Sequence, residues 1–79
     1  MTLREAVLQR LNEYCNQLDI TLHKLCSLSG IVHTTVFDLV AGRTKNPRLD
    51  TVYNLCLGLG ISISEFFDSP LFNEENIES

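Results

Sequence analysis

Hydrophobic residues recur at intervals of three or four along the first 18 positions of the chain. Spacing of this kind places side chains along one face of a helix. We therefore predict an amphipathic helix over residues 2 to 18. Its inward stripe consists of Leu3, Val7, Leu11, Tyr14 and Leu18, widened by Leu8 and Cys15.

A second, shorter helix is predicted to begin after Thr21 and to end at Gly30. The Thr21 hydroxyl can accept a hydrogen bond from a free amide of the first helical turn. Ile20 and Leu25 have the spacing of a hydrophobic staple across this helix start. Gly30 suits the left-handed position that ends many helices.

A third helix is predicted over residues 32–41, with Gly42 at its end. Its cap is weak, because Val32 stands where a serine or threonine would accept an amide hydrogen bond. The residues expected to be buried are Val36, Leu39 and Val40. A helix, a short glycine turn and a second helix with a free first turn form the arrangement that places a helix in the DNA major groove.

Two further helices are predicted before Pro70. Asp50 is a candidate cap for the fourth helix, which Gly60 ends. Its inward face consists of Val52, Leu55, Cys56 and Leu59. Ser62 and Glu65 have the spacing of a capping box, so the fifth helix begins there and ends at Pro70.

The length of 79 residues and the apolar content of 44% support one compact domain with a single core. No alternating run indicates a strand, so we expect an all-α fold of five helices over residues 1–69. Residues 70–79 should form a short acidic tail, in which Leu71 and Phe72 can fold back on the core and residues 73–79 are expected to be mobile. No apolar run approaches the roughly 18 residues that a membrane helix needs, and no signal peptide is evident. A cytoplasmic location is expected.

The three cysteines, Cys15, Cys26 and Cys56, occur at apolar spacings and form no C-x-x-C pair. We interpret them as reduced, buried thiols that pack as small apolar side chains. A metal site from His23, Cys26 and His33 is disfavoured, because Cys26 takes a small buried position between two helices. The sequence contains no nucleophile, base and orienting group in a recognisable set. We therefore expect neither enzymatic activity nor a cofactor.

The net charge of -4 is distributed unevenly along the chain. Residues 1–67 contain six acids and six bases, whereas the remaining four acids lie in a segment without a base. Arg43, Lys45 and Arg48 fall within six residues, and no acid occurs between Asp38 and Asp50. A phosphate backbone responds to such a local patch within a Debye length of about 8 Å.

The spacing of Leu25, Gly30, Val36 and Gly42, followed by GRTKNPRLDTVYNLCLGLGISISEFF, resembles the lambda-repressor-like helix-turn-helix family of phage Cro and repressor proteins and XRE-type regulators. The resemblance covers about residues 7 to 67. Its most specific parts are the glycine-basic loop before Pro47 and the LGISISEFF ending. It implies a transcriptional regulator, acting as a repressor, that binds a palindromic operator in double-stranded DNA as a homodimer.

The resemblance also implies roles for individual residues. The positions that would contact bases from the third helix are His33, Thr34, Phe37 and Asp38. The positions that would contact phosphates are Thr21, Leu22, His23, Arg43, Thr44, Lys45 and Arg48. At the start of the second helix the contact would come from backbone amides, since a helix N-terminus favours an anion.

Several residues depart from the family pattern. Leu22 stands where a polar side chain is usual, and Phe37 and Asp38 are uncommon on a DNA-facing surface. Asp38 can accept a hydrogen bond from cytosine or adenine, but it also repels phosphates. The family commonly pairs an arginine at position 15 with a glutamate at position 40. Here both are apolar, and we predict that Cys15 and Val40 touch in the core.

Simpler interpretations stay open beside these. His33 can be an ordinary exposed residue, and Phe37 can face DNA, face a partner protein or turn into the core. The main alternative function is a protein-interaction module or antitoxin-like regulator on the same scaffold, with weak or lost DNA binding. Leu22, Val32, Phe37 and the low charge favour this alternative, whereas the basic loop opposes it.

Overall fold

A computed structural model of the protein describes residues 1–78. The elements are α1 (Leu3–Leu18), α2 (Leu22–Ser29), α3 (His33–Ala41), α4 (Leu49–Leu59), α5 (Ile63–Phe67) and the short 3-10 turns η1 (Pro70–Phe72) and η2 (Glu74–Asn76). No strand occurs in the described part of the chain. The predicted all-α fold of five helices is confirmed. Ser79, the last residue of the expected tail, lies outside the described residues.

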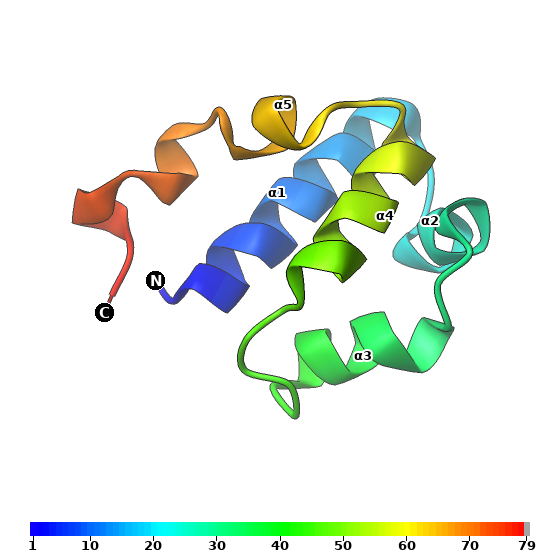
Figure 1. Cartoon of the computed structure of the whole chain (residues 1–79), viewed down its shortest axis with the longest axis horizontal. Coiled ribbons are helices and arrows are strands. Elements are labelled where there is room, and N and C mark those ends of the chain that lie inside the picture. Colours follow the sequence, from blue (N-terminus) through cyan, green and yellow to red (C-terminus); the bar gives the residue numbers. More distant parts are fainter. Residues whose placement is uncertain (79) are drawn as a thin grey trace.

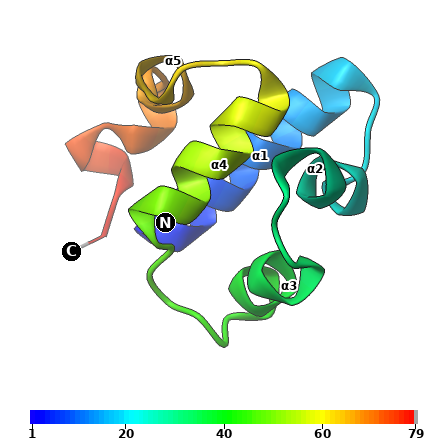
Figure 2. The same cartoon turned by 45° about the vertical axis from the view of Figure 1, so that its right-hand side comes forward.

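The helix-turn-helix pair α2 and α3 occupies one end of the molecule. Figures 1 and 2 show α3 on the side away from α5, and Figure 1 shows both chain termini at a third edge. Helix α2 packs against α1, α3 and α4, and α5 packs against α4. The surface of α3 that faces away from the other helices is therefore open to a partner.

The core is built from apolar residues of all five helices. Its buried members are Val7, Leu11, Cys15, Leu25, Cys26, Val36, Val52, Leu55, Cys56, Leu59 and Phe66. Burial of the three thiols is confirmed, and desolvation raises the pKa of each. Within residues 1–78, no helix is both long enough and apolar enough to cross a membrane.

Three positions predicted to face inward are exposed. Leu3 and Leu18 are the first and last residues of α1, where no neighbouring helix covers them. Val40 is 48% exposed, because α3 turns the edge formed by Val36 and Leu39 toward the core. Cys15 is buried. The prediction that Val40 packs in the core with Cys15 is therefore wrong.

A charged side chain, and not a contact between Cys15 and Val40 in the core, joins α1 to the end of α3. Arg4 Nη1 donates a hydrogen bond to the carbonyl oxygen of Leu39 at 2.9 Å. That carbonyl lies in the last turn of α3, where the helix dipole favours a cation. An arginine from another part of α1 thus joins the two helices.

The caps agree with the sequence at α2 and α3, agree in part at α5, and differ at α1 and α4. Thr21 caps α2, and the Ser62 hydroxyl accepts from the Glu65 amide at 3.0 Å. Within residues 1–78, the second hydrogen bond of the predicted capping box, from the Ser62 amide to the Glu65 side chain, is not formed. Asp50 is not the cap of α4, because the chain already turns helical after Arg48, leaving Asp50 in the first turn. A complete capping box, which we did not predict, joins Thr2 and Glu5 at the start of α1. Its hydrogen bonds hold the pKa of Glu5 below the usual value.

The described part of the acidic tail returns to the domain. The Phe72 ring lies 4.8 Å from the Phe67 ring and 6.0 Å from the Phe66 ring, between centroids. The Met1 ammonium donates to the Asn76 carbonyl at 3.0 Å, and the Glu78 amide donates to the Met1 carbonyl at 2.8 Å. Phe72 thus folds back on the core as expected, and Asn76 and Glu78 contact the amino terminus, which the sequence did not predict.

Helices α2 and α4 approach closely at Gly58. A Cβ atom placed on Gly58 would lie 3.1 Å from Ser29 Cβ and 3.2 Å from Ser29 N. The Ser29 hydroxyl points into the same space, is buried and has no hydrogen-bond partner within residues 1–78. Only a residue without a side chain permits this packing.

We expect Gly58→Ala to lower the free energy of unfolding by about 1 to 3 kcal/mol, because overpacking forces the helices apart. At a position without such a close contact, alanine in place of glycine would raise the free energy of unfolding by about 0.5 to 1 kcal/mol. A decrease would therefore indicate overpacking and an increase would indicate helix propensity. Urea unfolding followed by circular dichroism measures the change. Ser29→Ala is the matched control: alone it should be neutral or stabilising, and in Gly58→Ala it should restore part of the loss. An unchanged or higher stability of Gly58→Ala would contradict the close approach.

Candidate nucleic-acid interface

A short turn between α2 and α3 sets the angle of the two helices. Gly30 ends α2 in the left-handed conformation, with φ of 68°, and its amide donates to the carbonyl oxygens of Cys26 and Ser27. The Ile31 amide then donates to the Cys26 carbonyl at 3.0 Å. Extended backbone at Val32 leads directly into α3. Residues 30–32 thus form the turn of a helix-turn-helix unit.

The first turn of α3 is open. Val32 occupies the N-cap position, is 69% exposed and offers no side-chain hydrogen bond. Thr34 and Phe37 are exposed, and Phe37 keeps 47% of its surface accessible. The interpretation of Phe37 as a core residue is therefore excluded. Val40 continues this exposed apolar surface one turn later.

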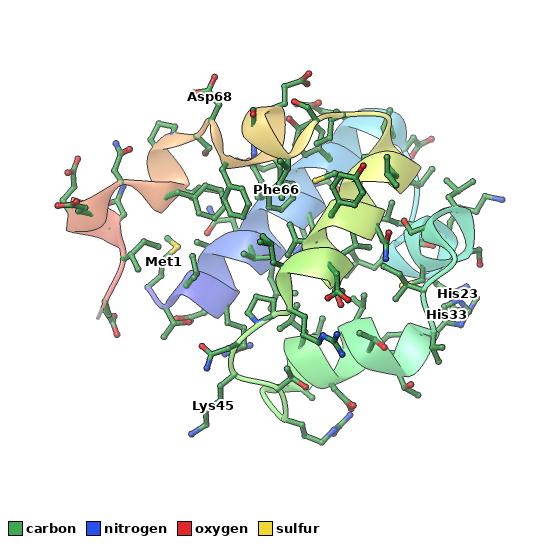
Figure 3. The ribbon with its side chains drawn as sticks, viewed as in Figure 1. Met1, His23, His33, Lys45, Phe66 and Asp68 are labelled. Carbon is green, nitrogen blue, oxygen red and sulfur yellow. The ribbon has the colours of Figure 1, made fainter. Side chains whose placement is uncertain are left out.

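His33 is held against α2 instead of projecting freely. Its ring lies 3.7 Å from the His23 ring, between centroids, with the two planes tilted by 35°. Its Nε2 atom lies 3.4 Å from the Ser27 hydroxyl. Figure 3 shows the two rings together at the junction of α2 and α3. We predicted neither the pairing of the two histidines nor the contact with Ser27, because both depend on the angle between the helices.

The loop after α3 folds back onto the helix. The carbonyl oxygen of Asp38 accepts hydrogen bonds from the amides of Arg43 and Thr44 at 2.9 and 3.1 Å. The Asp38 side chain also pairs with Arg43, with 2.8 Å between Oδ1 and Nε. Both side chains remain accessible to solvent.

The cationic loop carries less free charge than its sequence indicates. Arg48 pairs with Asp50 at 3.1 Å, and Arg43 pairs with Asp38. In residues 1–78, Lys45 forms no ion pair, and Figure 3 shows its side chain projecting away from the helices. Asp38 precedes the loop and Asp50 follows it, and these two acids neutralise Arg43 and Arg48. Residues 38–50 therefore carry one net positive charge.

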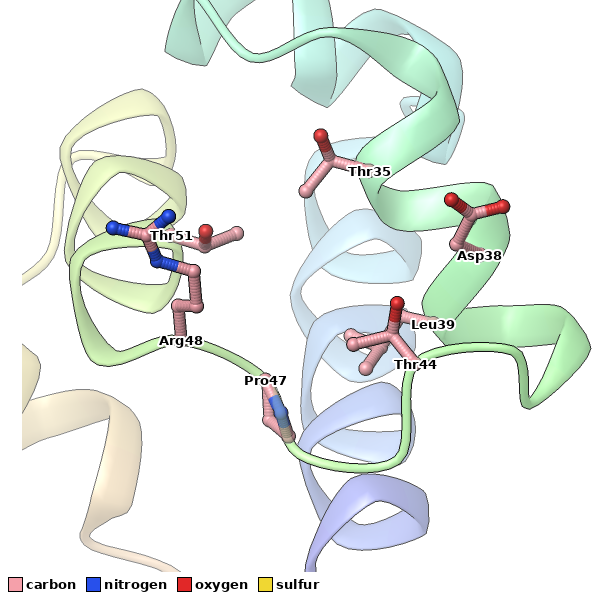
Figure 4. A pocket seen from close by; sticks show the side chains of 7 residues that line it. All are labelled: Thr35, Asp38, Leu39, Thr44, Pro47, Arg48 and Thr51. Carbon is pink, nitrogen blue, oxygen red and sulfur yellow. The ribbon is translucent and has the colours of Figure 1, made fainter.

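A hollow of about 180 Å³ lies between α3 and the start of α4 (Figure 4). Its lining consists of Thr35, Asp38, Leu39, Thr44, Pro47, Arg48 and Thr51. Three threonines, the Arg48 guanidinium and the Asp38 carboxylate thus surround an apolar floor formed by Leu39 and Pro47.

The amino end of α2 is the last part of the candidate nucleic-acid interface. The Thr21 hydroxyl accepts a hydrogen bond from the Lys24 amide at 3.0 Å, so it serves as a cap. Leu22 packs partly against the core, which leaves only its amide for an external acceptor. His23 stacks on His33. In the described residues, no three histidine, cysteine or acidic side chains lie close enough to hold a metal ion.

An exposed α3, set by a three-residue turn and flanked by a cationic loop, defines a helix-turn-helix DNA-binding domain. The family model of the Cro/C1-type HTH DNA-binding domain matches residues 10–70, and the chain belongs to this family of DNA-binding regulators. Among solved structures it resembles the prophage Lp1 protein 11, with 36% sequence identity and a TM-score of 0.84 over 94% of this chain and 97% of that one. No curated protein sequence matches the chain.

The missing cap of α3 generates a stability prediction. Val32→Ser should raise the free energy of unfolding by about 1 kcal/mol, because its hydroxyl can accept a hydrogen bond from the first turn. Chemical denaturation without DNA measures this gain. Val32→Ala is the control: it removes the exposed apolar side chain without adding an acceptor and should change little. Equal stabilities of the serine and alanine variants would show that the first-turn amides need no cap.

Proposed function

We propose that the protein is a transcriptional repressor that binds a specific double-stranded operator with α3 in the major groove. The observation that carries this proposal is the open first half of α3 beside the cationic loop, in a member of a DNA-binding family. The base-contacting residues are His33, Thr34, Phe37 and Asp38. The phosphate-contacting residues are Thr21, Leu22, His23, Arg43, Thr44, Lys45 and Arg48.

The exposed surface of α3 offers several kinds of base contact. The major groove is about 12 Å wide and accepts a helix of this size. Thr34 supplies a hydroxyl, and Phe37 supplies an apolar ring that can pack against a thymine methyl group. His33, held by His23 and Ser27, presents its ring with little freedom to reorient.

The phosphate contacts supply general affinity. Lys45 is the loop cation without an acidic partner in residues 1–78, so it contributes the strongest attraction. Arg43 and Arg48 keep further N–H groups beyond those used in their ion pairs. Backbone amides at the start of α2 add hydrogen bonds that need no side-chain charge. Affinity should therefore be moderate and dependent on salt.

A titration tests DNA binding. Genomic fragments retained by the protein provide the site, and fluorescence anisotropy at several salt concentrations provides the slope of log K against log salt. Lys45→Ala should weaken binding to all sequences and make the slope shallower by about 0.9 for each phosphate that the variant no longer neutralises. Lys45→Arg, which keeps the charge, should leave the slope unchanged. Binding that responds neither to salt nor to Lys45→Ala would contradict the proposal.

A homodimer fits the exposed face of α4. Leu49, Tyr53 and Leu57 are exposed at intervals of four residues, and Asp50 is the only charged residue of the helix. In Figures 1 and 2, α4 lies in front of α1, whereas α3 lies below both. A second copy packed against α4 about a two-fold axis would leave both α3 helices on one side. Two copies can then reach half-sites about 34 Å apart.

Leu57→Lys should convert this dimer into a monomer, because it places a charge in an apolar interface. Sedimentation velocity over a concentration series measures the change. Leu18→Lys is the control, since Leu18 is 50% exposed, against 59% for Leu57, and lies at the end of α1. The proposed interface predicts that only the Leu57 variant loses self-association. Equal behaviour of both variants and the wild type would place the dimer contact elsewhere.

A protein partner is the second candidate, and one observation favours it. Phe37 and Val40 are both exposed and lie three residues apart on α3, so they form an apolar surface on the proposed DNA-binding side. Such a surface suits a protein that would compete with DNA for α3. Retention of no preferred genomic fragment by the protein would favour this alternative.

A further inference from the structure

The Asp38 side chain has a charged partner on the proposed DNA-binding surface. Arg43 Nε lies 2.8 Å from its Oδ1 atom, and the Arg43 and Thr44 amides both bind its carbonyl oxygen. Asp38 therefore joins α3 to the loop through its backbone and its side chain together. The ion pair with Arg43 favours one orientation of the carboxylate.

This arrangement leaves one acceptor available. Within residues 1–78, Oδ2 of Asp38 accepts no hydrogen bond, and the side chain is 41% exposed. An ionised carboxylate only accepts hydrogen bonds. The group on DNA that it can contact must therefore be a donor at the edge of a base.

We propose that Asp38, positioned by Arg43, accepts a hydrogen bond from N4 of cytosine and makes the protein prefer a C·G pair at one position of each half-site. This inference rests on the proposed function, because it assumes that α3 enters the major groove. It assigns Asp38 as the determinant of one base and Arg43 as its positioning residue.

The choice of cytosine follows from the groups at the base edges. Guanine and thymine present acceptors in the major groove, which repel a carboxylate. Adenine offers the N6 donor, but its N7 acceptor lies beside it and also faces the incoming oxygen atoms. Cytosine presents the N4 donor without an acceptor of its own in the groove. It is therefore the base that best suits a carboxylate held in one orientation.

Arg43 has two effects on this contact. Its Nε atom fixes Oδ1, and its positive charge offsets the repulsion between Asp38 and the DNA phosphates. Its terminal nitrogens remain for a phosphate oxygen, consistent with its proposed role in the loop. Loss of Arg43 should therefore reduce both general affinity and the discrimination at one base pair.

Selection of bound duplexes from a randomised pool, using the full chain, identifies the preferred site. Titrations then compare the four base pairs at each position of that site. The wild type should bind C·G at one position about tenfold or more tightly than the other pairs. Asp38→Asn should move this preference toward A·T, because an amide can contact both N6 and N7 of adenine.

A double-mutant cycle separates positioning from general affinity. Arg43→Ala should reduce the preference for C·G in the wild type but should not reduce it further in the Asp38→Ala background, because the two residues act through one contact. Lys45→Ala is the control: it should weaken binding to all four pairs equally. Thermal unfolding of each variant checks that the fold is retained.

The outcomes distinguish the two proposals. A wild-type protein that selects no sequence overturns the proposed function, and this inference with it. A selected site whose base preferences are all unchanged by Asp38→Asn overturns this inference alone. So does a cycle in which Arg43→Ala affects all four pairs equally.

Discussion

The close approach of α2 to α4 at Gly58 fixes the geometry of the rest of the domain. Helix α2 contacts α1, α3 and α4, and the missing side chain at position 58 lets the Ser29 backbone reach α4. Only residues 30–32 connect α2 to α3, so the two helices cannot move far relative to one another. The orientation of α3 therefore follows from the packing of α2, and a shift of α2 would move every proposed base contact at once.

The opposite end of the molecule is held by separate interactions. Arg10 Nε donates to the Phe66 carbonyl and Nη2 donates to the Glu65 carbonyl, each at 2.8 Å. These bonds satisfy the last carbonyls of α5, and the Arg10 guanidinium also lies 4.6 Å from the centroid of the Tyr14 ring. Phe72 extends the aromatic packing into the tail. The end of the domain opposite α3 is thus held by hydrogen bonds and aromatic packing.

The sequence predicts most of this fold, because helical periodicity and glycine positions act locally. Gly30, Gly42 and Gly60 all adopt the left-handed conformation at helix ends, as their positions indicate. Periodicity fails where burial depends on distant neighbours. It cannot tell that α3 buries the Leu39 edge and leaves Val40 exposed, since this depends on the direction in which α3 meets α1. The capping box of Thr2 and Glu5 has the T-x-x-E spacing of such boxes, so its signal is present in the sequence.

Charge at the candidate interface is the part that the sequence predicts least well. A count of cations gives a basic loop, but Asp38 reaches Arg43 only because the chain reverses at Gly42. An exposed pair of this kind contributes little to stability, typically about 0 to 1 kcal/mol. Its larger effect is on binding. General affinity for DNA rises with each phosphate neutralised, whereas specificity depends on contacts that only the correct bases complete. The pairing of Arg43 with Asp38 lowers general affinity, whereas the base contact that we propose for Asp38 would raise specificity. The low positive charge of this surface is therefore compatible with selective binding.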